Sequence, residues 1–249
     1  MFGFRPRLPI AEEERLWVDE GLRRLSRMLG ASRMQNAKVV LPTDEFFPDP
    51  YAPNEAGVEA LFCRICGYMG VPRSHVELAI IPDTSELVEM LPEHSYQPDG
   101  PAGLHYGKRC EGEHPLVAVR ASLLKDPLTV VATLAHELGH VILLDGGRLD
   151  RDDEDMEPLT DLATVYLGMG VFTANAARRF LQFQQDRRQG WSMSRLGYLP
   201  EDVYAYALAR FAQERGEIDP AWTAHLSTNL KTWFRQSSKW MRNEYMPIR

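Results

Sequence analysis

The sequence predicts an α+β protein in which a small sheet packs on one long apolar helix, while the N- and C-terminal parts are mainly helical. Two short segments rich in β-branched residues, 76–81 and 116–120, have the composition of strands. Residues 127–144 are almost entirely apolar, as in a helix buried on most sides. The flanking parts of the chain repeat apolar residues at helical spacing. Together these patterns favour an α+β fold.

The N-terminal part is expected to begin with an amphipathic helix over residues 11–29 that ends at Gly30. Its inner face is predicted to carry four leucines: Leu16, Leu22, Leu25 and Leu29. The elements expected next, in order, are a strand at 37–41, a loop at 43–54, a helix at 55–69, a strand at 76–81 and an irregular stretch at 83–108.

A long helix over residues 127–144 is expected to follow the strand at 116–120 directly. Asp126 is a good N-cap, Pro127 suits the first helical position, and Gly146 is a suitable C-terminal glycine. Gly139 lies inside this helix, where glycine costs about 1 kcal/mol relative to alanine. We therefore expect another backbone or a substrate to approach the helix closely at Gly139.

After residue 172 the chain is predicted to be helical, mainly over 201–215 and 220–245. We expect three parts that pack into one compact domain. They are an N-terminal α/β portion at 1–114, a core with the most informative motifs at 115–175, and a helical C-terminal portion at 176–249.

His136, Glu137 and His140 form the pattern His-Glu-x-x-His on the long apolar helix. Residues four apart lie one turn above each other, so the two imidazoles can face a single point. Catalytic zinc commonly takes three protein ligands, of which two His and a carboxylate are a standard set, and keeps a position for water. Glu137 could take a proton from that water and pass it to a leaving amine. The pattern therefore predicts a Zn²⁺ site.

The third metal ligand is predicted to be Glu157, at the end of an acidic connector. A second helix is expected to begin near Asp155, with Pro158 in its first turn. A stripe of polar or small residues on this helix should face the first helix, and consists of Glu157, Asp161, Thr164 and Gly168. Asp161 would then accept a hydrogen bond from a ligand histidine and fix its tautomer. The alternative third ligands are Asp161 itself and the connector acids Asp152, Asp153, Glu154 and Asp155.

These residues resemble the gluzincin metallopeptidases, in which His-Glu-x-x-His is followed on a second helix by Glu-x-x-x-Asp. The stretch from Glu157 to Ala163 looks most like the corresponding pattern of HtpX-type peptidases and of ImmA/IrrE-type proteins, with Thr160 in place of the usual Ala. The resemblance covers roughly residues 116–172. It implies a zincin-like fold, and it implies that the strand at 116–120 forms a sheet edge along which an extended peptide pairs.

Length and composition indicate a soluble globular protein. The chain has 249 residues, of which 44% are hydrophobic and 25% charged. No segment is expected to be long enough to span a membrane, and the N-terminus lacks the apolar stretch of a secretory signal, so we expect a cytoplasmic protein. A net charge of −7 argues against a nucleic-acid partner. Five arginines between residues 178 and 195 are explained by a solvated helix face.

The three cysteines offer a second candidate zinc site. Cys63, Cys66 and Cys110 could join His105 or His114 in a Cys₃His site. However, the apolar residues around Cys66 follow a helical period, and the odd number of cysteines agrees with a reducing compartment. We therefore interpret Cys66 as a core residue.

The sequence predicts a zinc-dependent metallopeptidase that acts on a peptide or protein, with Glu137 as general base. Candidates for stabilising the oxyanion are Tyr198, Tyr206, His225 and Arg195, whereas Tyr166 should lie on the opposite side of its helix. The main alternative is a metal-binding regulatory or interaction protein with a masked or vestigial site, in which residues 83–108 could form the mask. A closed structural zinc site is the third hypothesis, and it leaves Glu137 without a role.

Overall fold

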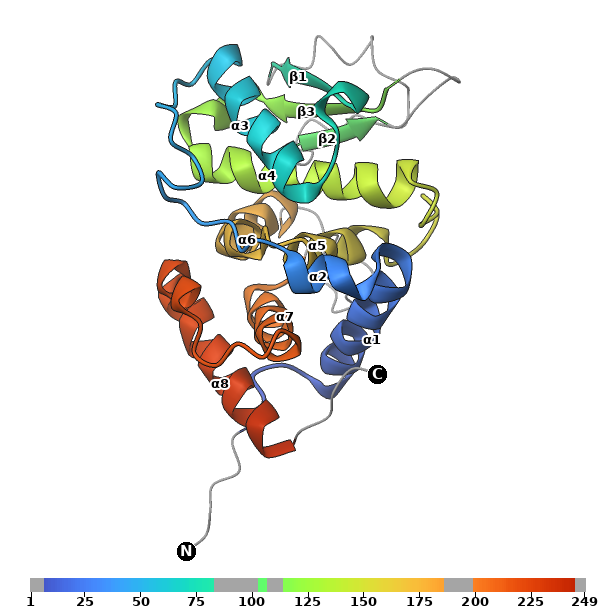
Figure 1. The fold of residues 1–249 in the computed structure, drawn as a ribbon, viewed down its shortest axis with the longest axis vertical. Helices are drawn as coiled ribbons and strands as arrows, with labels where there is room; N and C mark the ends of the chain where they lie inside the picture. The colour runs from blue at the N-terminus through green and yellow to red at the C-terminus, as the bar shows by residue number, and fades with distance from the viewer. Residues whose placement is uncertain (1–6, 83–102, 107–113, 186–198, 245–249) are drawn as a thin grey trace, which may run out of the picture.

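The computed structural model describes residues 7–82, 103–106, 114–185 and 199–244. It confirms an α+β protein that is mostly helical (Figure 1). In Figure 1 a small sheet lies at one end of the molecule, α5 and α6 lie in the middle, and α1, α7 and α8 form the other end. One cluster of buried apolar side chains runs through all of these elements.

The sheet described has three strands in the order β1-β3-β2: β1 (Glu77–Ile81), β3 (Leu116–Arg120) and β2 (Gly103–Tyr106). β1 pairs parallel to β3, whereas β2 pairs antiparallel to it. The predicted strands at 76–81 and 116–120 are thereby confirmed. Two expectations were wrong: β3 is the central strand rather than a sheet edge, and part of the segment 83–108 forms β2 instead of being irregular.

Helix α4 (Pro127–His140) contacts β2 and β3 as well as α3, α5 and α6. As predicted, Asp126 caps it, because one carboxylate oxygen accepts a hydrogen bond from the Thr129 amide and the other from the Thr129 hydroxyl. A π-helical turn, Val141–Asp145, continues the helix to Gly146. Gly146 itself has right-handed helical angles, and it is Gly147, with φ of 64°, that takes the left-handed conformation.

The expectation that no segment is long enough to span a membrane was wrong for Pro127–Asp145. By length and composition this helical stretch could cross a membrane, but 78% of its most apolar window is buried inside the protein. In the described structure it is therefore the central core helix. This helix contacts both the sheet and the neighbouring helices, so most of its side chains must be apolar.

Helix α5 (Met156–Tyr166) begins where the sequence predicts, after Asp155. A turn at Gly168, whose φ is 88°, leads into α6 (Gly170–Gln185). The carbonyl of Gly168 accepts a hydrogen bond from the Val40 amide. The segment 37–41 lies against this turn instead of joining the sheet, so the predicted strand there was wrong.

The N-terminal helices are α1 (Glu12–Leu29), α2 (Ala31–Asn36) and α3 (Glu55–Met69). The predicted ends of α1 and α3 are confirmed, since Gly30 and Gly70 follow them with positive φ. Leu22 and Leu25 are buried as expected. Leu16 is not, because 52% of it is exposed on the outer side of α1.

The C-terminal part contains α7 (Glu201–Glu214), a 3₁₀ helix (Ala221–His225) and α8 (Thr228–Glu244). The single helix predicted over 220–245 is divided, because the chain becomes extended at Leu226. α7 contacts α1, α5, α6 and α8. It joins the C-terminal part to the helices that carry the candidate site.

Candidate metal centre

Close packing between α4 and α5 creates the candidate site. A Cβ atom on Gly139 would lie 2.8 Å from Cγ2 of Thr160 and 3.5 Å from the Thr160 carbonyl oxygen. Any side chain at Gly139 would therefore push the two helices apart. The predicted close approach at Gly139 is confirmed, and the approaching element is α5.

His136, His140 and Glu157 come together across this contact. The two histidine Nε2 atoms are 3.1 Å apart. Oε2 of Glu157 lies 3.1 Å from Nε2 of His136 and 3.4 Å from Nε2 of His140. One ligand atom from each residue falls within 4.8 Å of the others, so the three residues could hold a metal ion.

Neighbouring side chains fix the tautomers of both histidines. Asp161 Oδ1 accepts a hydrogen bond from Nδ1 of His136 at 2.8 Å. The Thr160 hydroxyl donates to the Met156 carbonyl, so it accepts from Nδ1 of His140 at 3.2 Å. With both protons on Nδ1, each Nε2 carries a lone pair.

These lone pairs decide whether the residues fit a metal. Two imidazole lone pairs and one carboxylate oxygen face the same point in the interior, where His136 is 2% and His140 5% exposed. Three acceptors at such distances repel one another unless a metal ion or a proton lies among them. The donor set therefore fits a divalent metal ion.

The electrostatics follow from burial and from this crowding. Burial lowers the pKa of His140. Burial also acts to lower the pKa of His136, but the carboxylates of Asp161 and Glu157 outweigh it and raise that pKa well above the usual value. For Glu157, burial would raise the pKa, but the two imidazoles hold the pKa far below its ordinary range. Burial raises the pKa of Glu137 to about 7. Glu137 is 4% exposed and follows His136 directly on α4.

Asp161 does more than the sequence could indicate. Its second carboxylate oxygen, Oδ2, accepts a hydrogen bond from the Leu199 amide at 2.7 Å. Burial, together with the Asp161 carboxylate, raises the pKa of the Tyr204 hydroxyl well above the usual value. Asp161 thus links His136 on α4 to the backbone just before α7.

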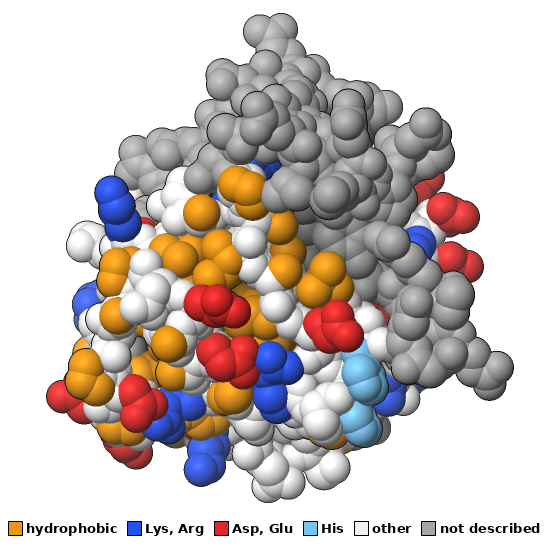
Figure 2. Space-filling view, turned by 90° about the horizontal axis from the view of Figure 1, so that it is seen from above, with side chains coloured by type: hydrophobic (Ala, Val, Ile, Leu, Met, Phe, Trp, Pro, Cys, Tyr) orange, Lys and Arg blue, Asp and Glu red, His pale blue; other side chains and the backbone are white. Residues whose placement is uncertain are grey.

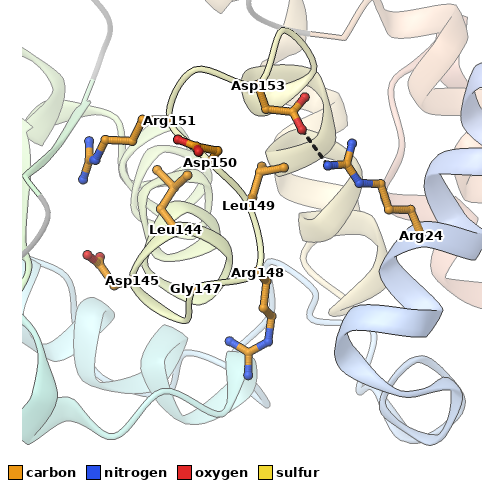
Figure 3. Close-up of a pocket in the computed structure, with 9 residues that line it drawn as sticks. All are labelled: Arg24, Leu144, Asp145, Gly147, Arg148, Leu149, Asp150, Arg151 and Asp153. Carbon is orange, nitrogen blue, oxygen red and sulfur yellow. Dashed lines mark hydrogen bonds and ion pairs between the residues drawn. The ribbon is translucent and has the colours of Figure 1, made fainter.

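Among the described residues, the cluster that could hold a metal includes none of the four connector acids. Asp153 pairs with Arg24 at 2.6 Å, and Asp155 accepts a hydrogen bond from the Trp17 indole at 3.0 Å, so both face α1. The connector also borders an open groove of about 610 Å³ beside the end of the π-helical turn. Figure 3 shows Asp145 and Arg151 on one side of this groove and the Arg24–Asp153 pair on the other.

Most of the oxyanion candidates are engaged elsewhere or lie outside the described residues. Tyr198 and Arg195 fall outside the described part. The Tyr206 hydroxyl donates to Asp19 on α1, and the Tyr166 hydroxyl donates to the Gly30 carbonyl. The remaining candidate, His225, ends the 3₁₀ helix before α8.

The alternative cysteine site is not assembled in the described part of the chain. Cys66 is buried in α3, where burial raises the pKa of its thiol to about 12, and Cys63 donates to Glu59. Cys110 lies outside the described residues. His105 pairs instead with Asp145, and His114 stacks on His75.

Two contributors to the site were not predicted from the sequence. Thr160 was noted only as a departure from a pattern, yet it orients His140. The contact of His105 with both Asp145 and the His140 ring was not predicted. A hydroxyl residue three positions after the third ligand is a signal that could have identified Thr160, since helix geometry places it near the same neighbouring helix.

Comparisons with family models, curated protein sequences and solved structures found no match to this chain. It is an α+β protein in which two buried histidines and one partly exposed glutamate form a cluster that could hold a metal ion.

Proposed function

We propose that this protein is a zinc-dependent metallopeptidase of the gluzincin type. The observation that carries the proposal is the convergence of two Nε2 lone pairs and a Glu157 oxygen beside the buried Glu137. A purely structural site would take a fourth protein ligand, and the described residues supply three. An open fourth position next to a carboxylate is the arrangement of hydrolytic zinc sites.

In the proposed reaction each residue has a separate task. Zinc, when bound, would act as a Lewis acid toward the peptide carbonyl and make a water molecule more acidic. Glu137 accepts a proton from the attacking water and delivers it to the departing amine. Asp161 and Thr160 hold the imidazoles of His136 and His140 in the tautomers that leave Nε2 free to bind.

The proposed zincin-like character also rests on the position of the sheet. α4 packs against β2 and β3, and β2 is the antiparallel strand at one edge of the described sheet. Edge strands can pair with an extended peptide through main-chain hydrogen bonds. We therefore assign to β2 the role that the resemblance implied for β3.

The substrate class follows as a peptide or protein, and nucleic acid is disfavoured. The chain carries a net charge of −7. Seen from the sheet end in Figure 2, the described surface mixes apolar, acidic and basic side chains without a broad basic patch on the visible part. A cytoplasmic location is part of the same proposal.

One observation favours the alternative of a masked regulatory site. His136, Glu137 and His140 are all at most 5% exposed, and only the Glu157 side chain, at 36%, reaches the surface. A protein of this kind would bind peptides without turnover. Efficient cleavage of defined bonds in a peptide library eliminates this alternative.

The Glu137→Gln variant tests the enzymatic proposal directly. It should keep its zinc, because Glu137 is not a ligand, and lose peptide hydrolysis by about 100-fold or more. Glu154→Gln, which changes an exposed acid of the connector, is the matched control. Cleavage by Glu137→Gln at the rate of the parent protein would refute the general-base assignment.

A further inference from the structure

A histidine outside the predicted ligand set lies beside the metal centre. His105, on the edge strand β2, places Nε2 2.5 Å from Oδ2 of Asp145, which ends the π-helical turn after α4. The His105 side chain is 3% and that of Asp145 11% exposed. This buried pair joins a sheet strand to the helix that carries both histidine ligands.

His105 also contacts a proposed ligand directly. Its ring stacks on the ring of His140, with centroids 5.7 Å apart and planes 22° apart. His136 meets the same ring edge-on, at 4.7 Å and 86°. Together with the hydrogen bond to Thr160, these contacts restrain the His140 imidazole on its face, on its edge and at Nδ1.

The π-helical turn explains how Asp145 reaches His105. His140 and Asp145 are five positions apart. In an α-helix that spacing would rotate the later side chain by about 140° away from the earlier one. In a π-helix, residues five apart are hydrogen-bonded neighbours on successive turns, so Asp145 stays on the side of His140. Wide turns of this kind are often found at functional sites.

We propose that His105 and Asp145 form a positioning pair that couples edge strand β2 to the metal centre. The pair fixes β2 against the end of α4 and, through the stacked ring, sets the orientation of His140. This inference rests on the proposed metal centre and deepens it. Under the proposed function, His105 therefore holds both the strand that pairs with a peptide, β2, and the metal ligand His140.

Cobalt substitution tests the coupling without any peptide substrate. The Co²⁺ form of each full-length variant would be compared by its visible absorption spectrum, by its metal affinity in competition with a chelator, and by hydrogen exchange of the β2 amides. His105→Ala should bind metal about 10- to 100-fold more weakly, shift the cobalt spectrum and lose exchange protection in β2. His114→Ala, which removes an exposed histidine stacked on His75, is the matched control and should change none of these.

His105→Gln separates the two contacts and guards against misfolding. Its amide can still donate to Asp145, so β2 protection should be retained, while loss of the imidazole face should still shift the cobalt spectrum. Faster exchange in β2 with an unchanged spectrum and unchanged affinity in His105→Ala would overturn the proposal, because the pair would then be only a clamp on the strand. If the wild-type protein cleaved no peptide while the His105 variants showed the expected spectral shift, the peptidase proposal would be refuted and the positioning pair would stand.

Discussion

Asp161 Oδ1 lies 2.8 Å from Nδ1 of His136, and both side chains are buried. The second Asp161 oxygen accepts from the Leu199 amide. A carboxylate satisfies both donors, whereas a carboxamide cannot, because its NH₂ group would face one of the two N–H groups. Both hydrogen bonds therefore require the carboxylate of Asp161.

Asp161→Asn should therefore weaken zinc binding by about 10- to 100-fold, the usual cost of losing a partner of a ligand histidine. The measurement is zinc affinity by chelator competition on the folded variant. Asp153→Asn changes an acid that pairs with Arg24 instead, and it should bind zinc like the parent protein. Equal affinities for the two variants would show that Asp161 does not orient His136.

Gly139→Ala should destabilise the protein even though alanine is the better helix former. The new Cβ would lie 2.8 Å from Cγ2 of Thr160, an overlap that costs about 1–3 kcal/mol in a packed core. Thr160→Ser removes this methyl group and keeps the hydroxyl that contacts His140. The double variant should regain most of the lost free energy of unfolding in denaturant titrations, and a cost that is unchanged by Thr160→Ser would contradict the packing explanation.

Asp19→Ala should be among the most destabilising substitutions outside the metal centre. Its carboxylate lies 3.0 Å from Nε of Arg210 and accepts from the Tyr206 hydroxyl, and Arg210 is only 4% exposed. Removing one partner of a buried ion pair costs about 3–5 kcal/mol when the other charge is left uncompensated. Because Glu214 still pairs with Arg210 at 3.1 Å, we expect a cost at the lower end of this range.

The control for Asp19→Ala is Glu20→Ala on the same helix, where an exposed acid pairs with Arg23 and Arg27. It should change the unfolding free energy by less than about 1 kcal/mol. Denaturant unfolding of both variants provides the comparison. A cost below about 1 kcal/mol for Asp19→Ala would show that the buried network contributes little.

Local signals explain which parts of the fold were predictable. The first residues of α3 and α4 are predictable because the side chains of Asn54 and Asp126 cap the first turns. Strand β3 is predictable from its apolar residues. His136 and His140 were predictable as neighbours because four residues make about one helical turn. Glu157 was placed by the start of α5 after Asp155.

The missed features all depend on contacts between distant segments. β2 has four residues and is defined by its backbone pairing with β3, so its own sequence carries little strand signal. The π-helical turn and the His105–Asp145 contact arise where α4 meets that strand. The segment at 37–41 has strand-like composition, but Val40 finds its partner in the turn at Gly168.

Elemental analysis of metal content tests the central claim most directly. Wild type, His140→Ala and Glu157→Ala would be purified, supplied with zinc and dialysed without chelator, with Asp152→Ala as a connector control. The expected result is one zinc per chain in the wild type and the control, with zinc lost or much weakened in the other two variants. A wild-type protein that holds no zinc, or a Glu157→Ala variant that keeps a full equivalent, would contradict the proposed centre.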